Sequence, residues 1–243
     1  PGALWGNVYS ISEAARAHSM GLDSLIGIPM KLAGSLLIGF LIYGIILAET
    51  GGGKFFIDIA ESIMGKYRGG PAKVAILASG FFGMLSGSPT SNVITSGSLT
   101  IPAMKKAGYP GRYAAAIEAC ASTGGVLMPP VMGTVAFIMA SFLNLPYSDI
   151  LLAALIPGLI FYIALIIQTD LYAAKNNLKG MDLNKIPKFL PTIINGFPYI
   201  ISFISLIWLI ISAKLESEAP YISSLSLIII LLVADISEPS ILA

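Results

Sequence analysis

The sequence predicts an all-α polytopic membrane protein, because of its composition and the lengths of its uncharged segments. Of its 243 residues, 56% are hydrophobic and 11% are charged, whereas about a quarter of a soluble domain is charged. Several uncharged segments approach or exceed the roughly 20 residues with which a helix crosses a bilayer. We therefore expect five or six transmembrane helices, a re-entrant helical hairpin and a helix broken at its centre.

The composition also excludes several classes of function. A net charge of +1 leaves no basic face for binding nucleic acid. The single cysteine, Cys120, and the single histidine, His18, argue against a disulfide framework within the chain and against a Cys/His metal site. Because no motif places a nucleophile beside a general base, we expect the chain to be no enzyme and to hold no cofactor.

Residues 1–73 are expected to form an N-terminal span and an interfacial helix. Residues 25–48 are apolar apart from Lys31, whose side chain can reach the interface, and they predict the first span. Residues 49–53 end this span. Residues 54–64 predict an amphipathic helix in the membrane interface, because apolar and acidic side chains fall on different faces. The apolar face carries Phe55, Phe56, Ile59 and Ile63, and the other face carries Asp58 and Glu61.

Residues 74–104 form an uncharged run of 31 residues, which is too long for one span and too short for two. The middle of the run is polar and rich in helix breakers. Each arm would extend about 18 Å, a little over half of the membrane. We interpret the run as a re-entrant hairpin whose second arm begins near Ser91 or Asn92; the alternative is an external loop between two short tilted spans. The polar middle consists of Ser86, Gly87, Ser88, Pro89, Thr90, Ser91 and Asn92.

Residues 113–143 contain one charged side chain, Glu118, and are again interrupted near their centre. The interruption consists of Ser122, Thr123, Gly124, Gly125, Pro129 and Pro130. Proline removes a backbone donor inside a helix but suits its first position. We therefore expect a broken helix whose second half begins at Pro129 or Pro130, and the alternative is a simple proline kink. Together, residues 74–143 would form one unit.

Residues 144–243 predict a short loop at 144–149 and further transmembrane helices at 150–169, 189–213 and 219–234. The positive-inside rule supports the hairpin interpretation, because a hairpin places eleven of the 14 Lys and Arg residues on one side. We take that side as cytoplasmic. The eleven are Lys54, Lys66, Arg68, Lys73, Lys105, Lys106, Arg112, Lys175, Lys179, Lys185 and Lys188, and the other three are Arg16, Lys31 and Lys214.

Two polar breaks at mid-membrane indicate a binding site, because non-helical backbone is tolerated there only inside protein or beside a wet cavity. Helix carbonyl ends attract a small cation and helix amide ends attract an anion. Neutral oxygens suited to Na⁺ or to a carboxylate lie at both breaks. Glu118, an intramembrane carboxylate, is a candidate for ion coupling or for a structural contact with Arg112 or a tip amide.

Residues 69–75, 82–93, 100–105 and 116–133 closely resemble the large permease subunit of TRAP (tripartite ATP-independent periplasmic) transporters. The last block resembles the form that is fused to the small subunit and served by TAXI-type binding proteins. The resemblance extends from about residue 22 to residue 180. It implies half of an elevator-type fold, in which a mobile transport domain moves an organic anion, often a carboxylate, together with Na⁺ or H⁺. The resemblance also implies that the protein is located in the prokaryotic cytoplasmic (inner) membrane.

The resemblance also implies site residues and partners. The expected partners are an extracytoplasmic solute-binding protein, a small membrane subunit or its fused equivalent, and the lipid bilayer. Family members contain two inverted copies of the hairpin and broken-helix unit, and this sequence contains one. We therefore expect a partial permease that requires a remaining half. The implied ion- and substrate-binding residues are Ser86, Gly87, Ser88, Thr90, Ser91, Asn92, Ser122, Thr123, Gly124, Gly125, Met128, Pro129 and Pro130, with Na⁺ ligands expected among Ser86, Ser88, Asn92, Ser122 and Gly124.

An ion channel or a membrane scaffold subunit that does not transport is the alternative function. In either case the polar breaks would line a pore or contact a partner.

Overall fold

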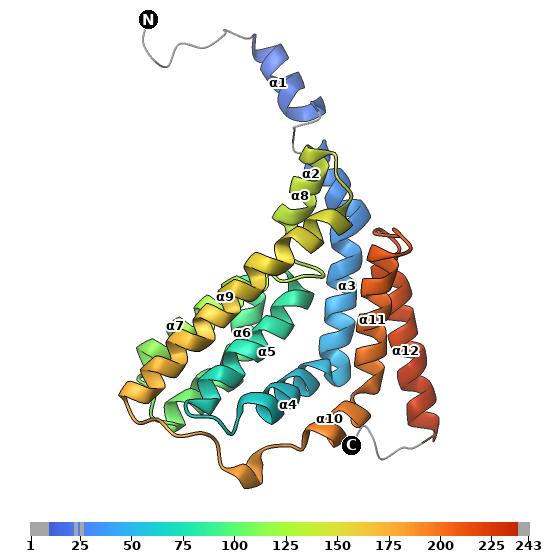
Figure 1. Ribbon diagram of the computed structural model, residues 1–243. Coiled ribbons are helices and arrows are strands. Elements are labelled where there is room, and N and C mark those ends of the chain that lie inside the picture. Colours follow the sequence, from blue (N-terminus) through green and yellow to red (C-terminus); the bar gives the residue numbers. More distant parts are fainter. Residues whose placement is uncertain (1–9, 22–23, 25–26, 238–243) are drawn as a thin grey trace, which may run out of the picture.

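The computed structural model describes residues 10–21, 24 and 27–237, and these residues contain helices but no strand (Figure 1). The prediction of an all-α protein is confirmed. The first two residues of the predicted span at 25–48 lie outside the described residues. The elements are α1 (Ile11–Met20), α2 (Ile28–Leu32), η1 (Ala33–Leu37), α3 (Ile38–Leu47), η2 (Ala48–Gly52), α4 (Gly53–Met64), α5 (Gly70–Ser86), α6 (Pro89–Lys106), α7 (Gly111–Gly125), α8 (Thr134–Leu143), α9 (Tyr147–Lys175), η3 (Leu183–Lys185), α10 (Phe189–Asn195), α11 (Phe197–Ile211) and α12 (Ala219–Ser237).

The predicted first span and the predicted amphipathic helix are parts of one long helical segment, Met30–Met64. The segment changes direction at Gly51, which has a φ of 97° within the π-helical turn η2. Only glycine adopts this conformation readily. After the turn, α4 runs crosswise from the lower end of α3 toward the lower end of α5 (Figure 1). Its apolar side chains Phe55 and Phe56 are buried, so this face of α4 packs on protein.

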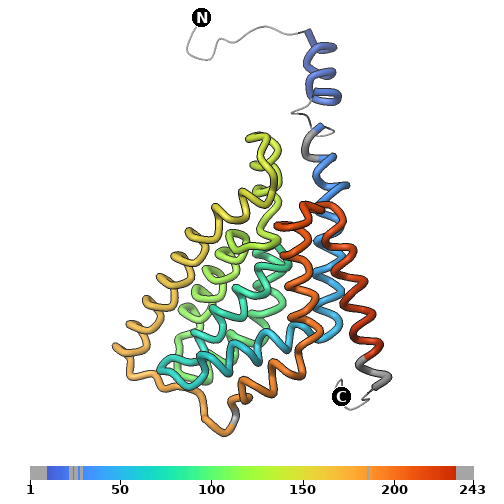
Figure 2. The backbone as a smooth tube through the Cα atoms, turned by 45° about the vertical axis from the view of Figure 1, so that its right-hand side comes forward, coloured from blue at the N-terminus to red at the C-terminus, as the bar shows by residue number. Residues whose placement is uncertain are grey.

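Helices α5 and α6 form the predicted hairpin, and α7 packs against both. The hairpin reverses beside the middle of α3, well below the end of the molecule formed by α2 and α8 (Figures 1 and 2). Helix α9 runs alongside this unit over 29 residues. The broken pair α7 and α8 lies against α9 over much of its length.

We expected residues 189–213 to form one span, but the structure divides most of this segment into two helices, α10 and α11, that do not continue each other's direction. The two helices meet at an angle of 71°. Gly196 lies between them, where an added Cβ would approach the Phe55 ring to 1.9 Å. Helix α11 then pairs with α12, and α12 pairs with α3. The Ser202 hydroxyl contacts both Tyr43 Oη at 3.2 Å and the Ser223 carbonyl at 3.0 Å inside this group.

The number of long apolar helices is smaller than the five or six spans that we expected. Among the described residues, Met30–Met64 and Tyr147–Lys175 are long and apolar enough to cross a membrane, and there is a third if the bent pair α10–α11 is counted as one broken span. Helices α5, α8 and α12 are apolar but shorter. Large apolar side chains on α9, α11 and α12 are exposed, which fits a helical membrane protein.

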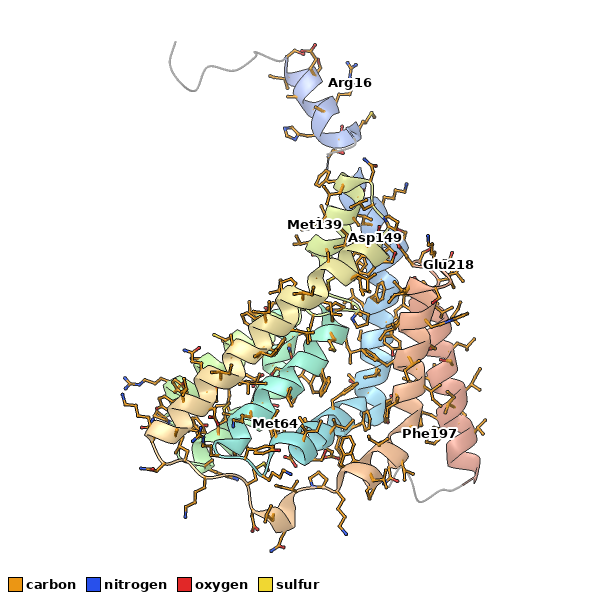
Figure 3. The ribbon with its side chains drawn as sticks, viewed as in Figure 1. Arg16, Met64, Met139, Asp149, Phe197 and Glu218 are labelled. Atoms are coloured by element: carbon orange, nitrogen blue, oxygen red, sulfur yellow. The ribbon has the colours of Figure 1, made fainter. Side chains whose placement is uncertain are left out.

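The two ends of the molecule differ in charge. The bases of the hairpin, of α7 and of α9 meet at one end, together with the loop that leads to α10 (Figure 1). These segments carry most of the lysine and arginine residues. Asp149 and Glu218 lie toward the opposite end, with Arg16 on α1 beyond them (Figure 3). The hairpin therefore brings the lysine- and arginine-rich segments to one end of the molecule, which is the charge asymmetry that supported its prediction.

Candidate functional site

The hairpin reverses direction within two residues, Gly87 and Ser88. Gly87 ends α5 with a φ of 56°. Ser88 is the N-cap of α6, since its hydroxyl accepts a hydrogen bond from the Ser91 amide at 3.4 Å, and Pro89 follows as the first helical residue. Our expectation that α6 begins near Ser91 or Asn92 is therefore wrong by two to three residues, because Ser88 already caps the helix.

The break after α7 is longer than expected. Helix α7 continues through Ser122–Gly125, where the interruption was expected to begin, and α8 begins at Thr134 and not at Pro129 or Pro130. Residues 126–133 form a loop in which the Gly133 amide donates to the Val126 carbonyl at 2.9 Å. The two prolines lie in the middle of this loop, joined by a cis peptide bond.

A residue from the next helix holds the loop between α7 and α8. The Tyr147 hydroxyl, at the start of α9, lies 2.7 Å from the Pro130 carbonyl and 2.6 Å from the Val131 carbonyl. Tyr147 is buried. This contact satisfies carbonyl groups that the missing helical turn leaves open.

The hairpin tip and the break lie in direct contact. The Val131 amide donates to the Met84 carbonyl at 3.2 Å. A Cβ added at Gly87 would lie 2.1 Å from the Met132 carbonyl oxygen, and one added at Gly83 would lie 2.2 Å from the Gly125 Cα. Glycine therefore allows the two backbones to approach, and the two polar segments singled out in the sequence meet in space.

Two hollows adjoin the tip. One, of about 250 Å³, lies between α3 and the hairpin and is lined by Ser86, Ser88, Ser91 and Asn92 among others. The second, of about 110 Å³, is bordered by Ser86, Gly87 and Ser88 on the hairpin and, on the other side, by Val131 and Met132 in the break and Thr134 at the start of α8. Hydroxyl groups and backbone thus face small hollows on the α3 side of the tip.

The remaining predicted site residues lie away from these hollows. Thr90 and Thr123 are exposed, and the Thr123 hydroxyl donates to the Ala119 carbonyl. Gly124 faces α9, where a Cβ would come within 2.2 Å of the Phe161 ring, and Met128 lies against Gly158 of α9. The predicted residues therefore do not form one group, since some border the tip hollows, Gly124 and Met128 pack on α9, and Thr90 and Thr123 are exposed.

Glu118 lies at the centre of a buried cluster of hydroxyl groups. Its carboxylate accepts from Ser79 at 2.5 Å, from Thr100 at 2.5 Å, from Ser122 at 3.2 Å and from Ser96. Glu118 and these hydroxyl residues come from α5, α6 and α7, so the contacts join all three helices. The expected partners were Arg112 or a tip amide, and the contacts in the structure are with hydroxyls.

Asn92 links this cluster, hereafter the Glu118 cluster, to the tip. Its side-chain amide donates to the Ser79 carbonyl at 2.7 Å, and its side-chain oxygen lies 3.2 Å from the Ser96 hydroxyl. Sequence reasoning missed Ser79, Ser96 and Thr100. A signal was present for two of them, because Asn92, Ser96 and Thr100 recur every four residues and share one face of a helix.

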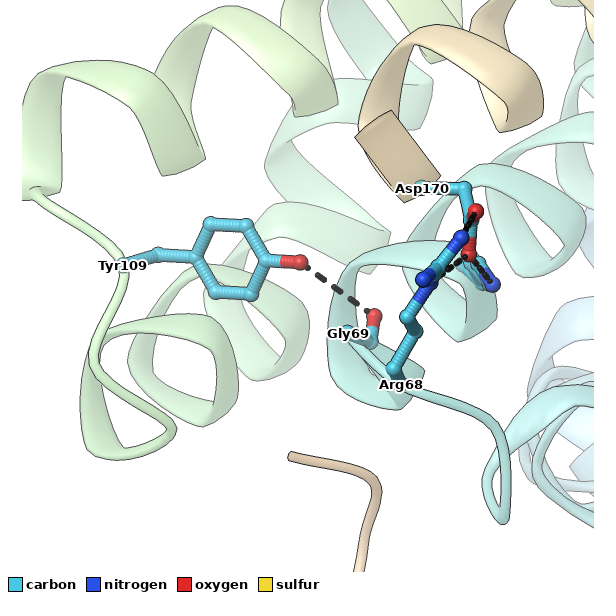
Figure 4. A network of polar contacts seen from close by, with 5 residues as sticks. Arg68, Gly69, Tyr109 and Asp170 are labelled. Carbon is cyan, nitrogen blue, oxygen red and sulfur yellow. Dashed lines mark hydrogen bonds and ion pairs between the residues drawn. The ribbon is translucent and has the colours of Figure 1, made fainter. Parts of the chain in front are cut away.

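An ionic contact joins the base of the hairpin to α9 (Figure 4). Asp170 binds both Arg68, with an Nε to Oδ1 distance of 2.9 Å, and the nearly buried Lys73, at 2.5 Å. The Tyr109 hydroxyl donates to the Gly69 carbonyl at 3.4 Å. The hydrogen bond with Asp170 raises the pKa of the Arg68 guanidinium, so this group stays charged.

We expect Asp170→Ala to destabilise the fold more than Arg68→Ala does. Loss of Asp170 leaves the Lys73 ammonium buried without its partner, at a cost of about 1–3 kcal/mol. Arg68 is largely exposed, and an exposed ion pair contributes little. Thermal unfolding of the two purified variants measures the difference. Equal melting temperatures would show that the contact with Lys73 does not stabilise the fold.

Comparison of the sequence with known proteins identifies the family that it matches. The sequence model of the "Tripartite ATP-independent periplasmic transporter, DctM component" matches residues 4–239. The C4-dicarboxylate TRAP transporter large permease protein DctM of Pseudomonas aeruginosa is 32% identical over 142 residues, which cover 58% of this chain and 33% of that protein. The isethionate TRAP transporter permease protein DctMQ of Oleidesulfovibrio alaskensis is 31% identical over 141 residues, covering 58% and 22%.

A third relative aligns over more of the chain. The ectoine/5-hydroxyectoine TRAP transporter large permease protein UehC of Ruegeria pomeroyi is 27% identical over 179 residues, which cover 73% of this chain and 41% of that protein. The chain thus spans between about a fifth and two fifths of the length of these three relatives.

Proposed function

Because this chain belongs to the DctM family of TRAP transporter large permease components, we propose that it forms part of a permease that imports a small organic anion. The observation that carries the proposal is the contact between the hairpin tip and the break after α7. Two interrupted helical elements meet there beside hollows lined with hydroxyl groups. Such an arrangement can bind a solute, and α6 directs its amide end toward it.

The proposed substrate carries an acidic group, most simply a carboxylate. The relatives named above are described as transporters of C4-dicarboxylates, isethionate and ectoine. Hydroxyl groups of Ser86, Ser88 and Ser91 would donate hydrogen bonds to such a group. Transport of the substrate would follow the elevator mechanism, with the hairpin re-entering the membrane from the lysine-rich, cytoplasmic side.

The proposed coupling ion is Na⁺ or H⁺. Of the five expected Na⁺ ligands, Ser86, Ser88 and Asn92 border the tip hollows. Ser122 contacts Glu118, and Gly124 packs on α9, so neither fits a site shared with the tip serines. We therefore assign Na⁺ binding to the tip oxygens. Glu118 stays our candidate for coupling by a proton, and uptake under a Na⁺ or a pH gradient separates the two ions.

The proposed partners follow from the family and from the length of the chain. They are an extracytoplasmic solute-binding protein, a small membrane subunit or its fused equivalent, and the remaining half of the permease. The proposed location is the prokaryotic inner membrane.

Reconstitution tests the proposed function. We expect vesicles that contain this chain within a complete permease to take up a labelled dicarboxylate. The flux should saturate and should require both the binding protein and a cation gradient. An ion current in the absence of both would identify a channel, and a lack of any flux would leave the scaffold alternative.

We expect Asn92→Ala and Ser122→Ala each to abolish uptake in this system without lowering the amount of protein in the membrane. Both side chains are buried and tie the tip or the Glu118 cluster to neighbouring helices, so their loss shifts the site. Quantitative blotting and uptake of the labelled substrate measure the two effects. Ser98→Ala is the control, because Ser98 is exposed on α6 and bonds within its own helix. Normal uptake by both variants would contradict the proposed site.

A further inference from the structure

A hollow of about 450 Å³ lies where η2 and the start of α4 meet the bent pair α10–α11. The proposed transport function does not use it. Its lining includes the charged residues Lys54, Asp58 and Lys188 and the rings of Phe55 and Tyr199. The hollows at the hairpin tip are lined by other residues, so this is a separate site.

The walls of this hollow, hereafter the corner hollow, are held by specific contacts. The 71° bend between α10 and α11 opens it, and Gly196 at the bend lets the Phe55 ring approach the backbone closely. The rings of Phe55 and Tyr199 have centroids 5.3 Å apart. The Tyr199 hydroxyl donates to the Thr50 carbonyl in η2. The hollow is therefore part of the packed fold.

The charges of the corner hollow are available to a ligand. Among the described residues, the ion pairs are those of Asp170 with Arg68 and Lys73, so Lys54, Lys188 and Asp58 form none. Lys54 precedes Asp58 by four residues and attracts its carboxylate without a direct ion pair, in the weaker order along a helix. The hollow thus offers two ammonium groups and one carboxylate.

Exposed apolar side chains lie on two of the helices that line the corner hollow. Leu231 of α12 lines it, and further large apolar side chains on α10 and α12 are exposed. These are Phe189, Leu190, Ile194, Ile229 and Leu232. The hollow also lies toward the lysine-rich end, where α4 and α10 meet (Figures 1 and 3). Charged groups beside exposed apolar helices fit an amphiphile with a polar head and acyl chains.

We propose that the corner hollow binds the headgroup of a glycerophospholipid that carries both a phosphate and a primary ammonium, as phosphatidylethanolamine does. Lys54 and Lys188 bind the phosphate, and Asp58 accepts hydrogen bonds from the ammonium. The acyl chains lie along α10 and α12. A phosphate lipid without an ammonium would leave the Asp58 carboxylate without its partner. The proposal does not rest on the transport function.

Photolabelling tests this proposal. The purified 243-residue chain is reconstituted in phosphatidylcholine vesicles that contain a phosphatidylethanolamine with a photoactivatable acyl chain. We expect labelled peptides from α10 and α12. Unlabelled phosphatidylethanolamine should reduce this labelling more effectively than phosphatidylglycerol or added phosphatidylcholine does.

Variants make the test specific. Lys54→Ala combined with Lys188→Ala should reduce the labelling about thirtyfold, since each lysine near a lipid headgroup contributes roughly 1 kcal/mol. Lys105→Ala combined with Lys106→Ala removes the same charge from the same end of the molecule, outside the hollow, and should leave labelling unchanged. Asp58→Asn should make phosphatidylglycerol compete as well as phosphatidylethanolamine. Circular dichroism checks that each variant is folded.

Three results would overturn the proposal. One is labelling spread over all exposed helices, and another is equal labelling of the double lysine variant and the control. The third is protection of the hollow by a protein segment when the chain is part of a larger permease, which would identify a protein and not a lipid as the occupant.

Discussion

Replacing Gly83 with alanine is expected to abolish uptake and to lower the free energy of unfolding by about 1–3 kcal/mol. The new Cβ would lie 2.2 Å from the Gly125 Cα. Because the opposing atom belongs to the backbone, it cannot move aside as a flexible side chain would, and α5 must separate from α7. Thermal unfolding of the purified variant and uptake in vesicles measure the two effects.

A matched glycine provides the control. Gly34 lies in η1, and a Cβ added there would find no atom within 4 Å. Gly34→Ala should therefore leave uptake unchanged and should maintain or raise the melting temperature, because alanine favours helix over glycine. If Gly83→Ala unfolds and transports as the unmodified chain does, the close contact between the hairpin and the broken helix is wrong.

Glu118→Ala is expected to destabilise the fold by about 3 kcal/mol. The substitution leaves a cavity at a position that is fully buried. It also removes the acceptor of hydroxyl groups on α5, α6 and α7, and unsatisfied buried donors are costly. The melting temperature and the amount of protein recovered from the membrane should both fall.

Glu118→Gln should lower the free energy of unfolding by less than about 1 kcal/mol. Its side-chain oxygen can accept from Ser79, and its amide can donate to Thr100, whose own proton can turn to the Ser96 carbonyl 3.0 Å away. Equal stability of the alanine and glutamine variants would show that these hydrogen bonds contribute little. Uptake by the folded glutamine variant tests the coupling role separately.

The sequence predicted the elements around the site better than their boundaries. Helix breakers and uncharged runs located the hairpin and the broken helix, because glycine and proline act locally. The start of α8 was missed, since the loop before it is held by the Tyr147 hydroxyl, 17 residues beyond Pro130. The 71° bend at Gly196 likewise depends on the Phe55 ring, far away in sequence.

The partners of Glu118 could be predicted only in part. The spacing of Asn92, Ser96 and Thr100 marks a polar face on α6, but no local pattern says which helix meets it. Arg112 or a tip amide was the expected structural partner, because Glu118 lies close to the expected membrane boundary. Arg112 lies in the first turn of α7, however, about 9 Å along the axis from Glu118, and it is exposed.

The hydrogen bond between Tyr147 and the loop after α7 has a mechanical consequence. It joins the start of α9 to Pro130 and Val131, so α8 is anchored at both of its ends. The loop that interrupts the broken helix is therefore restrained and does not act as a free hinge. As long as Tyr147 keeps these hydrogen bonds, α8 and α9 have to move together as one rigid body. Any tilt of this pair also moves the carbonyl groups that adjoin the hairpin tip.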